Sequence, residues 1–277
     1  MRERENKMVG YGIEGFNIKI RESLKKYKGK MHPVDKVGYK LKAYILAEKL
    51  KIAHAKVIGI YKRIEDVDWE NLPDEFVIKP QQGSSLNGVL PLIYKDNKYK
   101  NLIGLYGKYA ENIFMTREEA IAYFKKGIGS HSKSLWIEEL LSNPCPCNWE
   151  FHSFNGIIGL VEQLAKASYP ERRKFWTIDW AGLGHLFEEP EEGIKIKIDT
   201  TMQLPENKER LLEVARILSE EVNYPYVRVD LYSINGVIYI GELTPHPGTF
   251  AFYHLIDYWD KYLGELWKRA EGELSNG

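Results

Sequence analysis

Cysteine is scarce in this 277-residue sequence, which has only Cys145 and Cys147. Two cysteines one residue apart exclude a disulfide framework and favour a reducing compartment, so we expect a cytoplasmic protein. With His152 nearby, the pair still falls short of the four ligands that a structural zinc site takes. We therefore expect free thiols.

A net charge is also lacking, because 39 Lys and Arg residues balance 39 Asp and Glu residues. Without a broad basic surface, a nucleic-acid partner is not expected. The sequence has no run of about 18 apolar residues, so we expect no transmembrane helix. It also has neither Gly-x-x-x-x-Gly-Lys-Ser/Thr nor Gly-x-Ser-x-Gly. These absences exclude a P-loop nucleotide site and a serine nucleophile of the elbow type.

The strongest pattern that is present is a hairpin signal at residues 226–248. Two runs rich in Val, Ile, Leu and Tyr flank the turn pair Asn235-Gly236. In the first run Arg228 and Asp230 share one face, and the second run leads to Glu242. Two carboxylates and a guanidinium on adjacent strands suit Mg²⁺ and a bound phosphate. An exposed hairpin face with ordinary charges is the alternative, and this stretch alone leaves both open.

The register of this hairpin decides whether its two carboxylates can share a metal. A two-residue turn with regular pairing puts Asp230 opposite Gly241, and Glu242 then lies on the other face. A three-residue loop places Arg228 opposite Glu242, with Asp230 diagonal to it on the same face. We therefore predict the longer loop, or an equivalent bulge.

A second hairpin is predicted at residues 76–93. A strand at 76–80 is followed by a loop rich in Gly and Ser and by an apolar run at 89–93. Backbone N–H groups and hydroxyls of such a loop can fold over phosphates, and Lys79 at its base adds a positive charge. Taken alone, the segment fits a plain polar hairpin loop better.

Periodicity and turn signals predict the remaining elements. They are a helix at 35–50, a strand at 56–61, a capped helix at 116–127, a strand at 135–141, a hairpin of 149–154 and 157–164, an edge strand at 194–198, and helices from 205 and from 252. Residues 169–180 are aromatic and basic, which suits an anionic substrate, but we favour a solvated loop there. This mixed order predicts an α+β protein with two sub-domains that divide near residue 141.

Three motifs together resemble the ATP-grasp superfamily. Residues 77–89 look like the phosphate-covering hairpin of D-alanine–D-alanine ligases, and residues 137–140 look like the hinge strand that holds adenine. Arg228 and Asp230, followed by residues 242–248, are similar to Arg-x-Asp…Glu-x-Asn-x-x-Pro-Gly. Each motif is weak by itself, but the three occur in the expected order.

A closer resemblance is to the TupA-like family, which is linked to teichuronopeptide and polysaccharide synthesis. It is carried by residues 151–156, 173–180, 228–236 and 259–264. The resemblance implies an ATP-grasp fold of the α+β class with two sub-domains gripping the nucleotide. The limits we expect are an N-terminal segment at 1–34, a first sub-domain at 35–141 and a second at 142–277.

The resemblance also implies roles for the matching residues. Lys36 and Lys79 would bind the phosphates of ATP, and Gly83, Ser84 and Ser85 would cover them. Adenine would be flanked by Glu138 and Leu140, with Glu139 between them, and ribose would be held by Glu150. Mg²⁺ would be held by Asp230, Glu242 and Thr244, and catalysis would fall to Arg228, Asp230 and Glu242. Substrate contacts would come from Arg172, Arg173, Lys174 and Gly248.

The implied activity is an ATP- and Mg²⁺-dependent carboxylate–amine ligase that works through an acyl phosphate. The acid or amine would be an acidic sugar, an amino acid or a peptide in polysaccharide or cell-surface biosynthesis. A kinase of the same fold and a non-catalytic nucleotide-binding module are the alternatives. Thr244 stands where the superfamily has Asn, which puts a second Mg²⁺ in question. The segment at 1–34 is shorter than the domain that typically precedes the grasp, so the acceptor stays open, as does a homo-oligomer.

Overall fold

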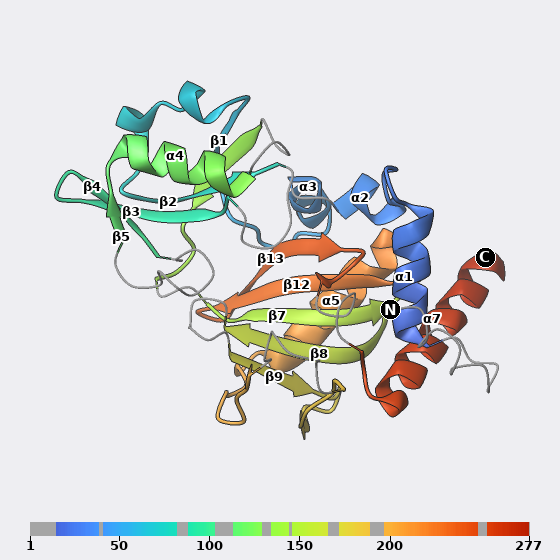
Figure 1. Ribbon diagram of the computed structural model, residues 1–277. Coiled ribbons are helices and arrows are strands. Elements are labelled where there is room, and N and C mark those ends of the chain that lie inside the picture. The colour runs from blue at the N-terminus through green and yellow to red at the C-terminus, as the bar shows by residue number, and fades with distance from the viewer. Residues whose placement is uncertain are drawn as a thin grey trace.

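The computed structural model describes residues 15–38, 41–81, 88–102, 113–128, 134–143, 146–165, 172–188, 197–248 and 254–276. The strands of these segments form two sheets, and helices pack around both (Figure 1). The protein is therefore of the α+β class, as the sequence predicts.

The first sheet has six strands in the order β1-β6-β2-β3-β4-β5. They are β1 (Val57–Tyr61), β2 (Glu75–Pro80), β3 (Leu90–Lys95), β4 (Lys98–Asn101), β5 (Ile113–Met115) and β6 (Leu135–Glu139). Helix α4 (Arg117–Ile128) covers one face, together with the short turns η1 (Ile64–Asp66) and η2 (Trp69–Asn71) (Figure 1). On β2, Phe76 and Ile78 enter this core, so alternation turns Lys79 toward the opposite face.

The second sheet has seven strands, in the order β10-β9-β8-β7-β12-β13 with β11 beside β9. They are β7 (Asn148–Phe154), β8 (Ile157–Ala165), β9 (Arg172–Trp176), β10 (Gly182–Leu183), β11 (Lys197–Ile198), β12 (Val227–Ile234) and β13 (Val237–Thr244). Strand β12 is a central strand, paired with β13 on one side and β7 on the other. Residues of β12 are therefore held from both sides.

The two faces of β12 differ in what covers them. Val227, Val229 and Leu231 are fully buried in a core that includes α5 (Lys208–Val222). On the other face, the end that carries Tyr226 lies under α1 (Phe16–Lys26) and α7 (Asp257–Asn276) (Figure 1). The rest of that face carries the charged residues of β12.

Two short helices, α2 (Pro33–Gly38) and α3 (Leu41–Lys49), pack beside β13 of the second sheet. Their buried residues join the core formed by α5, β12 and β13. The expected sub-domain limit at residue 34 remains a prediction, but α2 and α3 precede the first sheet in the chain and pack with the second. Among the described residues, no helix has both the length and the apolar character needed to span a membrane.

Local sequence signals account for the turns and one helix start. Asn155-Gly156 and Asn235-Gly236 all have positive φ, as a two-residue type I′ turn requires. At α4, the Thr116 hydroxyl accepts the Glu119 N–H at 3.3 Å, and the Glu119 carboxylate accepts the Thr116 N–H at 2.7 Å. This confirms the predicted capping box.

Several predicted elements differ from the structure. The single helix at 35–50 is two helices, with residues 39–40 outside the described segments. The solvated loop at 169–180 is wrong, since Arg172–Trp176 form β9 between β8 and two short strands. The helices predicted from 205 and from 252 begin at Lys208 and Asp257, a few residues later than predicted. Of the predicted edge strand at 194–198, only Lys197–Ile198 lies within the described residues and forms β11.

Lowering the pH should destabilise the protein through His32, which directly precedes α2. Its Nδ1 accepts the Val34 N–H at 3.2 Å, and burial lowers its pKa to about 3. Between that value and the ordinary pKa near 6.5, the unfolded chain takes up a proton that the folded chain does not. The free energy of unfolding should therefore fall as the pH drops below 6.5, by on the order of 2 kcal/mol at pH 5 for this residue.

The test is His32→Asn, because an Asn oxygen can still accept the Val34 N–H while no longer titrating. Urea unfolding between pH 7 and pH 5 should show a shallower loss of stability than in the natural protein. His246, whose burial lowers its pKa to about 4, should contribute the remaining slope. A slope unchanged in His32→Asn, and equal to that of the exposed His185→Asn control, would refute the assignment.

Candidate active site

The centre of the site is an ion pair between Arg228 and Asp230, two residues apart on β12. The Arg228 Nε donates to Asp230 Oδ1 at 2.6 Å, and Nη2 donates to Oδ2 at 2.7 Å. Both residues are buried. Their same-face placement, predicted from alternation, is confirmed.

Two further carboxylates surround the same guanidinium. The Arg228 Nη1 lies 3.1 Å from Glu150 Oε2 on β7, and Nη2 lies 3.4 Å from Glu242 Oε1 on β13. The pKa of Asp230 is raised to about 7, because burial, with the help of Glu150 and Glu242, outweighs the opposing effect of Arg228. One guanidinium thus faces three carboxylates, and the excess negative charge suits a cation.

The hairpin reaches this arrangement by a bulge and not by a long loop. Ile234 pairs with Val237 across a two-residue turn, so the predicted three-residue loop is wrong. The register shifts after Asp230, which pairs directly with Glu242 and leaves Gly241 unpaired. This bulge is the alternative that the sequence left open, and it brings both carboxylates onto one face.

Asn148 is a site residue that the sequence argument missed. Its Nδ2 donates to Glu150 Oε1 at 2.8 Å and to Asp230 Oδ2 at 3.3 Å. Its buried Oδ1 has no hydrogen-bond partner within the described part of the chain. A usable signal was its position two residues before Glu150 in an extended run, which places both on one face.

The donor set fits a hard divalent cation with few protein ligands. The described residues contain no cluster of three or more His, Cys, Asp and Glu side chains spaced to hold a metal ion. Asp230 and Glu242 nevertheless face each other, and Mg²⁺ is commonly held by one or two carboxylates with phosphate oxygens completing the shell. Thr244 has its Oγ1 3.4 Å from Arg228 Nη2, so the guanidinium lies beside that hydroxyl.

A second buried cluster lies on the first sheet around Glu138. Lys79 Nζ lies 2.5 Å from Glu138 Oε1, and the Oε2 accepts from the Tyr44 hydroxyl at 2.8 Å and from Trp136 Nε1 at 2.7 Å. Burial lowers the pKa of Lys79, but Glu138, Tyr44 and Tyr232 together outweigh it and the net shift of the pKa is upward. Lys79 is therefore a fixed positive charge, and Tyr44 and Trp136 are site residues not anticipated from the sequence.

The other residues predicted to bind the nucleotide do not belong to the Arg228 cluster or the Glu138 cluster. Lys36 is exposed on α2, and Leu140 is half-buried just after β6. Glu139 accepts the Lys56 N–H at 2.8 Å. Gly83, Ser84 and Ser85 lie outside the described residues.

The predicted substrate residues divide between the two faces of the second sheet. Arg173 lies 2.5 Å from Glu162 Oε1, and Glu162 pairs with Glu150, so both are on the Arg228 face. Lys174 points to the other face, 4.0 Å from the centre of the Trp176 ring, and Arg172 pairs with Asp199 at 3.2 Å.

Two more predictions concern Gly248 and the two cysteines. Gly248 is exposed at the end of the segment 197–248 and makes no part of the clusters described above. Cys147 is a half-buried free thiol whose pKa is raised by burial, which agrees with an unactivated thiol. Cys145 lies outside the described residues.

A family model for TupA-like ATPgrasp matches residues 17–268. The chain belongs to the TupA-like ATP-grasp family. The predicted resemblance is therefore confirmed over most of this ATP-grasp chain, although no curated protein matches its sequence.

Three solved structures of ligases share this fold. D-alanine–D-alanine ligase from Bacillus anthracis, complexed with ATP, is 16% identical, with 97% of this chain and 78% of that chain covered at a TM-score of 0.53. A second structure of that ligase is 15% identical to this chain. The match covers 96% of this chain and 78% of that one, at a TM-score of 0.54. VanG D-Ala:D-Ser ligase from Enterococcus faecalis is 15% identical, with 86% of this chain and 62% of that chain covered at a TM-score of 0.50. At these identities the similarity establishes the ATP-grasp fold, and the chain spans 62% of the VanG structure.

Removing the Tyr44 hydroxyl should destabilise this ATP-grasp protein. Tyr44→Phe keeps the ring and deletes one donor to the buried Glu138 carboxylate. A hydrogen bond to a charged group contributes about 1.5–3 kcal/mol, so the free energy of unfolding should fall by that amount. The measurement is urea unfolding, with Tyr258→Phe, whose residue is 67% exposed, as the control. Equal stability of the two variants would show that the tie to Glu138 does not stabilise the fold.

Proposed function

We propose that this protein is an ATP- and Mg²⁺-dependent carboxylate–amine ligase that works through an acyl phosphate. The observation that carries the proposal is the Arg228 guanidinium, buried among Asp230, Glu242 and Glu150 on one face of the second sheet. A site with excess carboxylate and one fixed guanidinium suits a metal-bound phosphate next to an anionic substrate. Membership of the ATP-grasp family supports the use of ATP.

The nucleotide would lie between the two clusters. Lys79 and Lys36 would bind its phosphates under the loop of Gly83, Ser84 and Ser85, and residues 138–140 would flank adenine. Mg²⁺ held by Asp230 and Glu242 would neutralise charge on the terminal phosphates. We propose a single such ion, since Thr244 supplies one neutral hydroxyl in place of an amide oxygen.

Glu150 fits a different role from the ribose contact first expected. Its Oε2 lies 3.1 Å from Arg228, its Oε1 accepts from Asn148, and its side chain is buried. We therefore propose that Glu150 orients Arg228. This assignment leaves the ribose contact open.

The reaction would proceed in two displacements. A carboxylate oxygen of the acid attacks the γ-phosphorus, the bond to the bridging oxygen breaks, and ADP leaves with that electron pair. The amine nitrogen then attacks the acyl carbon, phosphate leaves, and the nitrogen loses a proton to give an amide. Arg228 would hold the acid against the γ-phosphate and offset the repulsion between the two anions.

The substrates are proposed only by class. D-Alanine–D-alanine ligase and D-Ala:D-Ser ligase share this fold, which supports an amino acid or peptide as one partner. An acidic sugar in polysaccharide or cell-surface biosynthesis is the other class. Of the basic residues on β9, Arg173 is the one on the Arg228 face, so we propose that it helps to hold an anionic substrate.

Replacing Lys79 should weaken ATP binding. Lys79→Met keeps the length of the side chain and removes a charge that would contact phosphate. Loss of a charge-assisted contact of about 1.5–3 kcal/mol predicts a dissociation constant roughly 10 to 150 times higher. Calorimetric titration with ATP and Mg²⁺ measures this, with Lys49→Met, at an exposed lysine paired with Glu221, as the control. Equal ATP affinity in the two variants would make Lys79 a structural partner of Glu138 only.

The acyl phosphate should be trapped by hydroxylamine. Acids are supplied with ATP and Mg²⁺ while amines are withheld, and mass spectrometry should then detect the hydroxamate of the productive acid. Arg228→Lys, which keeps the buried positive charge but not the two-pronged geometry, should lower the yield at least tenfold while ATP still binds. A stable phosphate ester with ADP as the only products would support the kinase alternative. ATP binding without turnover on any acid would support a non-catalytic module.

A further inference from the structure

Glu162 on β8 is a buried carboxylate to which the proposed reaction gives no role. Its side chain is fully buried, and β8 lies between β7 and β9 in the second sheet. Its Oε1 lies 2.5 Å from Arg173 Nη1, and its Oε2 lies 4.0 Å from Nε2 of the buried His152. Because burial lowers the pKa of His152, that imidazole is neutral, and Arg173 is the fixed positive charge beside Glu162.

The two partners of this ion pair differ in how far they can move. Glu162 is packed within a central strand, and a close-packed interior holds a short side chain in one rotamer. Arg173 has a longer side chain that is 14% exposed, and the described strands outside β9, β10 and β11, are two residues long. Leaving a buried carboxylate without its cation is strongly unfavourable, so the fixed Glu162 decides where the Arg173 guanidinium lies.

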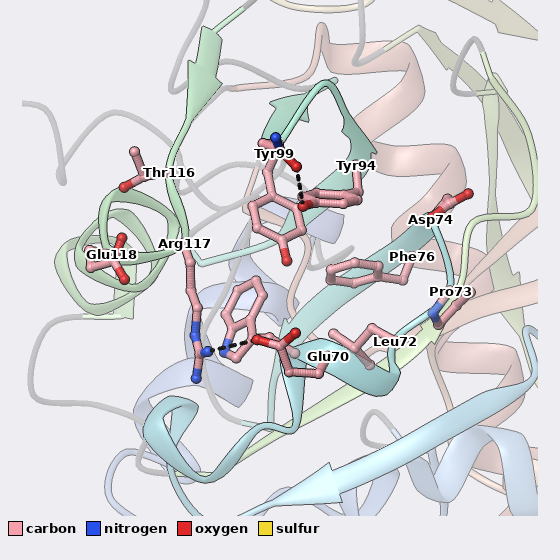
Figure 2. Close-up of a pocket in the computed structure, with 12 residues that line it drawn as sticks. Glu70, Leu72, Pro73, Asp74, Phe76, Tyr94, Tyr99, Thr116, Arg117 and Glu118 are labelled. Carbon is pink, nitrogen blue, oxygen red and sulfur yellow. Dashed lines mark hydrogen bonds and ion pairs between the residues drawn. The ribbon is translucent and has the colours of Figure 1, made fainter.

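An exposed ion pair on the first sheet shows what this burial changes. At the cavity of about 350 Å³ beside η2, β2 and α4, Arg117 lies 3.7 Å from Glu70 (Figure 2). Their side chains are 42% and 87% exposed, so water competes for both groups and the pair holds neither side chain firmly. The pair of Arg173 and Glu162 is shielded from that competition, and its geometry is kept.

The strand register places this pair next to the Arg228 cluster. Glu162 pairs with Glu150, and Glu150 pairs with Asp230, so three carboxylates form one row across β8, β7 and β12. Neighbouring strands lie about 4.8 Å apart, so the two guanidiniums that end in this row are on the order of 10 Å from each other. A single substrate molecule can therefore contact both of them.

We propose that Glu162 is a positioning residue that holds Arg173 against an anionic substrate. This role rests on the proposed function, in which Arg173 contacts that substrate. Carboxylates directly opposite each other on neighbouring strands repel, so each takes its own guanidinium: Arg228 for Glu150, and Arg173 for Glu162. Neutralising Glu162 would release Arg173 toward the excess carboxylates beside Arg228, and its donors would turn away from the substrate.

The first measurement is NMR on the full chain labelled at arginine, without any substrate. Rotation of the Arg173 guanidinium about its Cζ–Nε bond should be slow in the natural protein and about tenfold faster in Glu162→Gln, which removes the charge-assisted contact. The matched control is Glu273→Gln, which takes the same carboxylate from the exposed pair with Arg269 and should leave Arg173 unchanged. Equal rotation rates in Glu162→Gln and the natural protein would overturn the proposal.

The second measurement is hydroxamate formation from D-alanine, alanyl-alanine and glucuronate with ATP and Mg²⁺. For the acid that reacts best, Glu162→Gln should raise the KM about tenfold and leave kcat within about twofold, because substrate binding is lost while the reacting groups stay in place. Arg173→Gln should raise the KM by a similar factor. Adding Glu162→Gln to Arg173→Gln should have no further effect, since Glu162 acts only through Arg173.

The outcomes separate the role of Glu162 from the proposed function. Hydroxamate with an unchanged KM in Glu162→Gln, or KM effects that multiply in the double variant, would overturn the role of Glu162 and leave the ligase proposal intact. Hydroxamate from no acid in the natural protein would overturn the proposed function, and with it the substrate contact of Arg173. Unfolding curves identify a variant that has not folded. Glu162→Asp, which keeps the charge but withdraws the carboxylate by one methylene, then replaces Glu162→Gln, with a smaller rise in KM expected.

Discussion

The buried guanidinium of Arg228 is the constraint on which the second sheet depends. Removing a charge from water costs several kcal/mol, and only nearby carboxylates with good geometry offset that cost. Arg228 forms ion pairs with Asp230 on the same strand, with Glu150 on β7 and with Glu242 on β13. The guanidinium meets all three carboxylates only when β12 lies between those two strands, so the site and the order of the sheet stabilise each other.

The two faces of β12 differ in what packs on them. One face of β12 is apolar and packs with α5, so it stabilises the fold without regard to charge. On the opposite face α1 and α7 pack near Tyr226, and the carboxylates beyond it are those that we propose to hold a cation.

The first sheet is joined to this arrangement through Glu138. Tyr44 belongs to α3, which packs with the second sheet, yet its hydroxyl binds a carboxylate on β6. Lys79 on β2 shares that carboxylate, so its position is coupled to helix packing on the other sheet. The other face of the first sheet packs with α4 and takes no part in this link.

Short-range patterns in the sequence determined the hairpins, the Thr116 capping box, the α+β class and the shared face of Arg228 and Asp230. These features need only alternation, turn chemistry and neighbours within a few residues, so they can be predicted from the chain alone. Tertiary structure decided the bulge at Gly241, which a pattern of period two cannot place, and the Tyr44–Glu138 contact across 94 positions. It also made residues 172–176 a strand, because pairing with β8 outweighs the solvation of their charges. Long-range contacts of this kind depend on which surfaces meet after folding, and no local pattern encodes that.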